Sequence, residues 1–524
     1  MTRRVVPLVA TLLLLGFSGP DALGSGASRP RAQRAMRPTN LSIVAEDVLA
    51  AAKERGGAST TRSPSVPPRF SPRVPVVDSG FDAISKYQYS PADPTGAIGD
   101  SFYVTAVNTW AAVYKPNGTP HGNFTPPLRL KTEIKPGGFE FPGGTIDFDP
   151  KIVYDPYDDH FVLVYLAVHD ASKRSWIVVA TIPDATAPKK GTWCIKKFAG
   201  DQVDDSKVSW ADYPLLGFTS NRVTISTNQF GFGSFPYHYA QILSFPKSKL
   251  YNCEGVTPKV FAGDEVENPD GSKSFTVQPA VTNGTGAASK VQYLLSFEYF
   301  GGWGHKLVLW RLKVVNGRLK LANEAFKVGT AFTAPSGTQC GGSRSNPNTR
   351  WDTGDLRLVN AFFDVDLGNV YAAHAVESDI GGGYLESSAR WYEVDVANTL
   401  GNSMVERGIV GQSRLDLGWP VVATDSLGNL LMAVSGASGP DDVCLSAYGV
   451  DINTNTDAFG FAQVSAGEAR YEWGVGEERW GDYNAISRDP ADGTRMAMVN
   501  AIAKSDGAGS TFTFQQVVDV VAVI

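Results

Sequence analysis

Long hydrophobic runs are scarce in this sequence of 524 residues. The apolar stretch Val5–Phe17 is shorter than the ~20 residues that a membrane-spanning helix needs, and no later segment approaches that length. Arg3 and Arg4 precede the stretch, and small residues follow it up to Gly24, which is the order of a secretory signal peptide. We therefore expect a secreted, extracellular protein without a membrane span.

An excess of positive charge is also missing. The chain has 47 Lys and Arg against 53 Asp and Glu, a formal net charge of −6, and no basic stripe is visible along it. A protein that binds nucleic acid needs such a stripe to displace counterions from phosphates. The composition therefore excludes nucleic acid as the expected partner.

Cysteine is sparse, and its spacing excludes a CxxC zinc motif. The four residues Cys194, Cys253, Cys340 and Cys444 lie far apart, which allows one or two disulfides in an oxidising compartment. Cys194 and Cys253 occupy similar late positions in adjacent repeats, so they are the first pair to expect. Separately buried thiols are the alternative.

Several catalytic signatures are absent as well. The sequence has no GxSxG elbow, no HExxH helix, no P-loop and no dinucleotide fingerprint. Strands and helices do not alternate, which disfavours a doubly wound enzyme fold. The sequence contains no motif that identifies a cofactor, so the cofactor is unknown.

A sevenfold repeat is present instead. Each copy has a strand, a turn rich in Asp and Gly, and a second strand, as in RWGDYNAISRDPADGTRMAMVNAIA at 479–503. The copies begin at intervals of about 56 to 77 residues, which predicts a repeat architecture. Their aligned first residues are Asp93, Asp149, Asp212, Gln278, Asp355, Trp419 and Asp482.

The repeat predicts an all-β fold, a single seven-bladed β-propeller of four-stranded antiparallel blades. The last repeat has room for only three strands, so we expect Val76–Ser85 to supply its outer strand and to close the ring. The expected organisation is a signal peptide at 1–24, a flexible leader rich in Ser, Arg and Pro at 25–73 and a propeller at 74–524, in a monomer.

In a propeller, the first residues of the innermost strands and the ends of the second strands converge on one face. Carboxylates, amides and aromatic rings there are typical of a sugar-binding cleft. The candidate catalytic residues are Asp149, Asp212, Asp355 and Asp482, with Glu298, His169 and His374 as supporting acids or bases. The candidate substrate-binding residues are Asp93, Trp110, Asn228, Gln229, Tyr299, Trp419 and Arg479.

The Asp residues also have a structural interpretation. An Asp that starts a strand can hold the entry loop of its blade through backbone amides. Five carboxylates facing a narrow axis would raise one another's pKa values unless a positive group relieves them. A central cation such as calcium, which prefers oxygen ligands, is one possibility, and Arg357 and Arg479 are another.

A second set of acidic residues lies at the opposite ends of the hairpins, and we interpret these residues as turn formers. Their setting is similar to the Asp boxes of sialidases, but the full Ser-x-Asp-x-Gly-x-x-Trp pattern is absent. The set comprises Asp155, Asp158, Asp159, Asp364, Asp366, Asp425, Asp489 and Asp492.

The segments RWGDYNAISRDP, FDPKIVYDPYDDHF, ADYPLLG and DPTGAIGDSFYVTAVN resemble those of a family of large secreted bacterial propeller proteins. That family shares blade motifs of the form GDPxVxYD, DYPxLG and RWGDYS, and the resemblance covers about residues 80–524. It implies a propeller and an exported protein, but no particular activity. Phe148 and Asn484 depart from the motifs, which have Gly and Ser there.

Two functions remain open. In the first, the acidic and aromatic face binds an extracellular polymer, expected to be a polysaccharide, and cleaves it as a glycoside hydrolase or a polysaccharide lyase. In the second, the protein is a non-catalytic binding or adhesion module whose Asp residues are structural or hold a cation.

Overall fold

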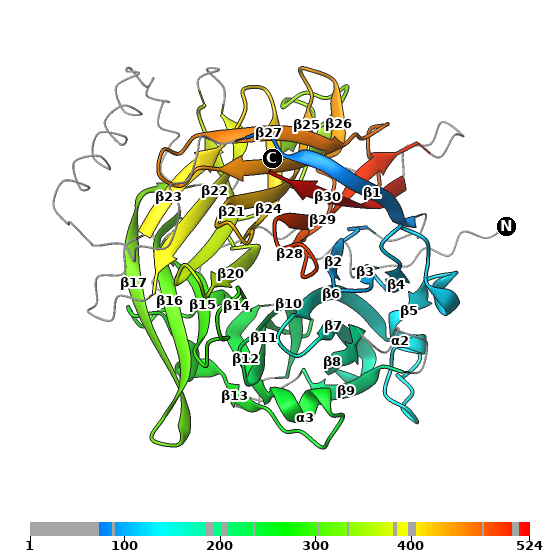
Figure 1. Ribbon diagram of the computed structural model, residues 1–524, viewed down its shortest axis with the longest axis vertical. Helices are drawn as coiled ribbons and strands as arrows, with labels where there is room; N and C mark the ends of the chain where they lie inside the picture. The colour runs from blue at the N-terminus through cyan, green and yellow to red at the C-terminus, as the bar shows by residue number, and fades with distance from the viewer. Residues whose placement is uncertain are drawn as a thin grey trace, which may run out of the picture. The chain divides into compact units, whose positions relative to one another are not determined.

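β-Strands account for nearly all of the regular structure in the computed structural model (Figure 1). This confirms the predicted all-β class. The structure describes residues 73–85, 90–184, 192–200, 208–233, 236–300, 303–332, 335–380, 385–396, 405–473, 476–505 and 513–523. The predicted signal peptide and all but the last residue of the predicted leader lie outside these ranges.

Within the described residues, the main strands form seven antiparallel groups of four, and the first six are in chain order from the inside outward. Group 1 is β2 (Thr95–Ile98), β3 (Tyr103–Val107), β4 (Trp110–Tyr114) and β5 (Leu128–Arg129). Group 2 is β6 (Ile146–Asp155), β7 (His160–His169), β8 (Arg174–Pro183) and β9 (Cys194–Ala199). Group 3 is β10 (Ser209–Phe218), β11 (Arg222–Gly231), β12 (Tyr237–Pro246) and β13 (Lys259–Phe261).

The later groups repeat this arrangement. Group 4 is β14 (Phe275–Asn283), β15 (Gln292–Phe300), β16 (Trp303–Val315) and β17 (Arg318–Phe332). Group 5 is β20 (Asn360–Asp364), β21 (Asn369–Ser378), β22 (Glu386–Asp395) and β23 (Val405–Val410). Group 6 is β24 (Asp416–Thr424), β25 (Leu430–Ser438), β26 (Val443–Ile452) and β27 (Phe459–Ser465), and group 7 is β28 (Ala485–Arg488), β29 (Arg495–Lys504), β30 (Thr513–Ala522) and β1 (Val76–Ser85).

Short elements connect the groups. They are the helices α2 (Leu130–Glu133) and α3 (Lys247–Tyr251), the 3₁₀ turns η2 (Gly122–Phe124), η3 (Asp170–Ser172), η5 (Gly263–Val266) and η6 (Pro347–Thr349), and the strand pair β18 (Gly337–Thr338) and β19 (Arg350–Trp351).

The first strand of each group lies innermost, around a common centre (Figure 1). Contacts run in turn from β2 to β6, β10, β14, β20, β24 and β28, and β28 contacts β2. Short parallel pairings of β10 with β14 and of β14 with β20 join groups 3 to 5 into one larger sheet. β1 pairs antiparallel with β30, so a strand from the beginning of the described chain is the outermost strand of the last group.

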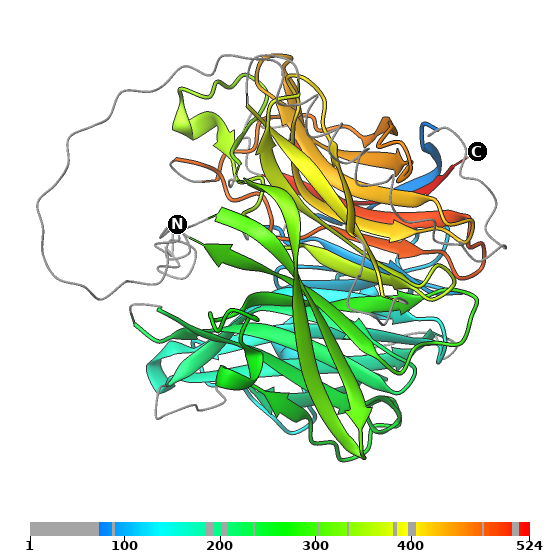
Figure 2. The same ribbon diagram turned by 90° about the vertical axis from the view of Figure 1, so that its left-hand side faces the viewer.

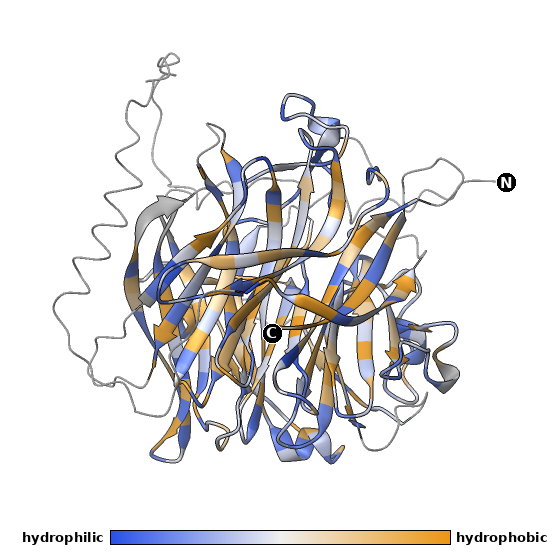
Figure 3. Cartoon of the chain, turned by 45° about the horizontal axis from the view of Figure 1, so that its top comes forward, coloured by the Kyte–Doolittle hydropathy of each residue, from blue (hydrophilic) through white to orange (hydrophobic). Residues whose placement is uncertain are grey.

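The core lies between neighbouring groups. Side chains of β7 and β8 pack against β10, β11 and β12, and similar clusters fill the other interfaces. Because a strand within a group is covered on both faces, it can be apolar without alternation; Phe161 to Ala167 of β7 are all fully buried. Figure 3 shows the hydrophobic residues concentrated in the strands, whereas the connecting turns are mostly hydrophilic.

Four of the predicted turn-forming Asp residues have that role at the ends of the first strands. Asp155, Asp364, Asp425 and Asp489 each end a first strand or follow it directly, and each Oδ1 accepts the N–H two residues further on, at 2.9–3.0 Å. The side chain thus replaces a backbone acceptor and fixes the turn.

Both cysteine pairs form disulfides. Cys194 is joined to Cys253, which was the first pair expected, and Cys340 is joined to Cys444. The second bridge connects the loop before β19 to the beginning of β26. No helix among the described residues has the length and hydrophobicity to cross a membrane.

Candidate functional site

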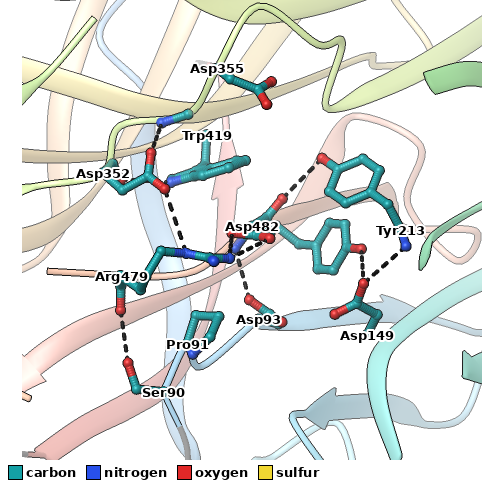
Figure 4. A network of polar contacts seen from close by, with 12 residues as sticks. Ser90, Pro91, Asp93, Asp149, Tyr213, Asp352, Asp355, Trp419, Arg479 and Asp482 are labelled. Atoms are coloured by element: carbon teal, nitrogen blue, oxygen red, sulfur yellow. Dashed lines mark hydrogen bonds and ion pairs between the residues drawn. The ribbon is translucent and has the colours of Figure 1, made fainter. Parts of the chain in front are cut away.

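Six Asp side chains gather where the first strands begin, and Figure 4 labels all of them except Asp212. We call them the aspartate cluster: Asp93, Asp149, Asp212, Asp352, Asp355 and Asp482. Each interacts electrostatically with at least one other member. The structure therefore brings together all five of the predicted strand-start carboxylates, and it adds Asp352.

The first strands of five groups have the same backbone irregularity near their beginnings. Five residues there have a left-handed backbone, with φ of 49–54°, and Asp149, Tyr213, Thr276 and Trp419 lie at breaks in the register between first and second strands. The fifth is Asp93. Such a bulge inserts one extra residue and redirects the neighbouring side chains, as at Asp149.

This geometry corrects the sequence alignment at three positions. The left-handed residue of group 3 is Tyr213, not Asp212, and that of group 4 is Thr276, not Gln278. Asp355 lies in the loop before β20 rather than at a strand start. In groups 1 and 2 the left-handed residue is an Asp followed by Pro, which suggests that Asp is the repeated feature. The repeated feature is instead the left-handed backbone, which Tyr213 adopts in group 3 and Thr276 adopts in group 4.

Four of the left-handed residues donate their backbone N–H to a residue earlier in the chain, which lies in the preceding strand group or, for Trp419, in the loop before β20. Asp149 donates to Asn108 Oδ1 (2.8 Å), Tyr213 to Asp149 Oδ2 (3.1 Å) and Thr276 to Asn228 Oδ1 (2.8 Å). Trp419 donates to the Thr353 carbonyl at 3.1 Å. These bonds join neighbouring groups, so part of the polar character of this end is structural.

Other bonds cross the centre. Asp93 Oδ1 accepts the N–H of Asp482 at 2.8 Å, which connects group 1 to group 7. Tyr483 OH donates to Asp149 Oδ2 and Tyr213 OH donates to the Asp482 carbonyl, both at 3.2 Å. The two tyrosine rings pack with centroids 4.9 Å apart.

Three positive side chains balance the cluster. Arg479 Nη2 contacts both carboxylate oxygens of Asp482 at 2.6 and 2.7 Å, and its Nε lies 3.6 Å from Asp352. Arg357 forms a two-pronged pair with Asp355 and lies over the Tyr213 ring at 4.3 Å. Lys151 Nζ lies 3.8 Å from the centroid of the Tyr483 ring.

Burial dominates the electrostatics. It raises the pKa of Asp149 to about 8, helped by the charges of Asp212 and Asp482, and it raises the pKa of Asp212 to about 7 against the nearby Arg357. The pKa of Asp352 rises to about 6 and that of Asp93 rises well above its usual value, both mainly through burial. Burial also lowers the pKa of Lys151 to about 7. Asp93, Asp149, Asp212 and Asp352 therefore hold their protons more tightly than ordinary Asp side chains.

The members differ in accessibility. The side chains of Asp352 and Asp355 are 30% and 26% exposed, whereas Asp93 is fully buried and Asp212 is 5% exposed. Asp352 and Asp355 are thus the members of the cluster that a ligand reaches first. Asp93, Asp149, Asp212 and Asp482 are buried.

A polar cavity of about 70 Å³ lies among the first strands. Lys151, Gln278, Asn360, Asn484 and Arg488 are among its lining residues. Gln278, an aligned repeat start, therefore faces this interior space, and Asn484 donates to the Trp419 carbonyl at 2.8 Å. The other motif departure, Phe148, packs edge-on against Trp210.

The three supporting acids and bases have partners outside the cluster. Glu298 pairs with Lys306. His169 Nε2 lies 3.0 Å from the Gly143 carbonyl and its Nδ1 accepts the N–H of Ser172. His374 is buried beside Phe297 with Nε2 3.0 Å from Tyr392 OH, and burial holds its pKa well below its usual value.

Several predicted binding residues are engaged in the framework. Gln229 is fully buried and bonded to Ser209, Thr227 and Gln241. Asn228 bonds Thr276 as described above.

Two aromatic candidates show the same pattern. The Trp110 ring lies under Arg129 at 5.2 Å, whereas Trp419 is 3% exposed and donates through Nε1 to the Asp352 carbonyl. The side chain of Tyr299, in β15, lies outside the part that the structure describes.

Sequence reasoning missed Lys151, Tyr213, Tyr483 and Asp352. A signal for the tyrosines exists, because the dipeptide Asp-Tyr occurs at 212–213 and again at 482–483. The sequence-based prediction used only the Asp of each pair. In the described part of the chain, no three His, Cys, Asp or Glu side chains are arranged to hold a metal ion, and the charges that face the carboxylates are Arg and Lys.

No protein-family description matches the sequence, and no curated protein does. Among solved structures, the chain is similar to the α-L-arabinanase of Penicillium chrysogenum complexed with arabinobiose, at 10% identity and a TM-score of 0.37, covering 86% of this chain and 99% of that one. It is similar to Trypanosoma rangeli sialidase at 10% identity and 0.37, covering 85% and 60%. It is also similar to the GH93 α-L-arabinofuranosidase of Fusarium graminearum at 9% identity and 0.36, covering 86% and 98%. At these TM-scores we take nothing about function from the likeness.

Proposed function

We propose that the protein is a secreted, monomeric, seven-bladed β-propeller of the bacterial family that its blade motifs resemble. The seven strand groups would be its blades. The run of contacts from β2 around to β28 and back to β2 supports a closed ring, and the pairing of β1 with β30 supports closure by the two ends of the domain.

We further propose that the aspartate cluster binds an extracellular polysaccharide and cleaves its glycosidic bonds. One observation carries this proposal: Asp212, whose pKa is raised to about 7, lies close enough to Asp482 to feel its charge, while Asp482 is paired with Arg479. Acid and base roles at one site require two carboxyl groups in different environments, and here one is buried with a raised pKa while the other is paired with an arginine.

In this proposal Asp212 donates its proton to the oxygen of the bond that breaks. The carboxylate of Asp482 stabilises the developing positive charge on the sugar and acts as base or nucleophile. Arg479 pairs with Asp482 through its two contacts at 2.6 and 2.7 Å. The partly exposed Asp352 and Asp355 and their arginine partners hydrogen-bond sugar hydroxyls at the entrance.

The test is a screen of residues 25–524 against plant, algal and microbial polysaccharides, with new reducing ends and unsaturated products scored together. New reducing ends that vanish in Asp482→Asn support the proposal. Acid–base catalysis accounts for about 10²–10⁴-fold in rate, so the loss should be of that order. Unsaturated products would reassign the reaction to a lyase.

A matched control separates chemistry from folding. Asp147 lies two residues before Asp149 on the same strand, is buried and pairs with Arg129 and Lys131. Asp147→Asn should therefore keep its activity. Equal losses in Asp147→Asn and Asp482→Asn would contradict a chemical role for Asp482.

A non-catalytic binding module is the second candidate. The observation that favours it is the use of Asp93 and Asp149 as acceptors for the backbone amides of Asp482 and Tyr213, which is a structural task. Binding of one polymer without any cleavage across the screen would select this alternative.

A further inference from the structure

Two loops bring Arg479 and Asp352 to the site. The cross-linked loop, residues 335–352, contains β18, η6, β19 and Cys340. The arginine loop comprises residues 466–473 and 476–482, between β27 and β28. Figure 2 shows the lime-coloured loop around η6 close to the orange segment beyond β27, and the contacts between the loops agree.

The loops hold one another through both backbone and side chains. Gln339 Nε2 donates to the Tyr471 carbonyl and Gln339 Oε1 accepts the Tyr471 N–H, both at 2.8 Å. Further along, Asp352 donates its N–H to the Glu478 carbonyl at 2.9 Å, and Glu478 donates to the Arg350 carbonyl at 3.0 Å. These bonds set the backbone directly beside Arg479.

Cys340, the neighbour of Gln339, attaches this assembly to group 6. Its disulfide to Cys444 reaches the start of β26. Two polar contacts reinforce it: Thr338 donates its N–H to Asp416 Oδ2 at 2.8 Å, and Gly341 donates to Asp442 Oδ1 at 2.8 Å. The cross-linked loop is therefore attached to group 6 through Cys340 and its neighbours, and it also binds the arginine loop.

We infer that Gln339 and the Cys340–Cys444 disulfide are positioning groups for the site: they hold the arginine loop so that Arg479 lies between Asp352 and Asp482. The Tyr471 ring transmits this restraint, because it packs edge-on against Trp480 at 5.0 Å, and Trp480 follows Arg479 directly. Importance for ligand binding rests on the proposed function, whereas the positioning itself does not.

The chain provides its own control in the second disulfide. Cys194–Cys253 joins β9 to the segment after α3, far along the chain from both loops. We would compare Cys340→Ser/Cys444→Ser with Cys194→Ser/Cys253→Ser by hydrogen exchange. Gln339→Leu is a third variant, which removes both bonds to Tyr471 but keeps the disulfide.

The expected result is faster exchange of amides within 466–482, by about tenfold or more, in Cys340→Ser/Cys444→Ser and in Gln339→Leu, while β29 and β30 keep their protection. The control pair should leave 466–482 unchanged. Unchanged exchange of this segment in both site-side variants would overturn the inference, whether or not the wild type binds any polymer.

A second measurement separates positioning from general loss of stability. Because Arg479 lowers the pKa of Asp212 and Asp352 against the effect of burial, its displacement should move the pH profile of cleavage or binding to higher pH. An unshifted profile with reduced amplitude would contradict positioning. If the wild type binds nothing while exchange responds as expected, the proposed function fails and the positioning stands.

Discussion

Individual carboxyl groups determine the behaviour of this site. The pKa values of Asp149 and Asp212 are raised to about 8 and about 7 because both side chains are buried. An ordinary Asp titrates near pH ~4. Asp149 and Asp212 therefore stay protonated in the folded state at mildly acidic pH, where an ordinary Asp is ionised.

The raised pKa values of Asp149 and Asp212 predict that the stability of the protein depends on pH. Between about pH 4 and 7 the folded state keeps protons on Asp149 and Asp212 that the unfolded chain has released, so the free energy of unfolding falls as the pH rises. The contribution is complete below about pH 4 and is lost as the pH passes the folded pKa values. We expect Asp149→Asn, which has no proton to lose, to flatten the plot of Tm against pH in this window.

The exposed Asp492, which only forms a turn, provides the control. Asp492→Asn should keep the wild-type slope. A wild-type slope in Asp149→Asn as well would show that Asp149 does not hold a proton in the folded state.

At the scale of single elements, the bulged entry of the first strands joins neighbouring groups. Asn108 is the clearest case: its Nδ2 donates to the Pro91 carbonyl at 3.1 Å and to Asp93, and its Oδ1 accepts the N–H of Asp149 at 2.8 Å. Asn108→Ala should destabilise the protein by about 1–3 kcal/mol, because it removes the acceptor of the buried Asp149 N–H and one of the two hydrogen bonds to the buried Asp93 carboxylate. Chemical denaturation measures this change.

Asn117 provides a comparison of the same residue type. It bonds only within an exposed turn to Thr119, so Asn117→Ala should change stability far less. Equal effects of the two substitutions would mean that the bonds of Asn108 contribute little to the joint between groups 1 and 2.

The elements also show what the sequence could predict. The Asp residues at the far ends of the hairpins form turns as expected, because an Asx turn depends on local sequence alone. The alignment of strand starts failed at Tyr213 and Thr276, because a left-handed backbone at a bulge does not select one residue type. Lys151 and Asp352 were missed because their approach to the cluster depends on packing between segments far apart in the chain.

For the whole molecule, the important feature is that β1 from one end of the described chain pairs with β30 from the other. A chain that begins at residue 86 lacks β1 and should expose an unpaired strand edge of group 7. We expect a lower Tm and aggregation on heating, measured by light scattering, relative to a chain that begins at residue 73. Identical melting of the two chains would show that β1 adds no stability.

At this scale the sequence predicted more than at any other. The all-β class and the strand Val76–Ser85 came from the period of the repeat and from the missing strand of its last copy. The site was predicted as a set of converging Asp residues, since equivalent positions in a repeat converge around a common centre. Glu298, His169 and His374 were expected with them, but these three residues have partners of their own outside the aspartate cluster.

The most direct test of the central claim compares the wild type, Asp212→Asn and Asp147→Asn on one polysaccharide, with affinity and release of reducing ends measured on the same samples. Our account predicts that all three bind the polymer within a few-fold of one another, while cleavage by Asp212→Asn alone falls by about 10²–10⁴-fold. Undiminished cleavage by Asp212→Asn, or an equal fall in Asp147→Asn, would contradict the assignment of the aspartate cluster as the site of chemistry.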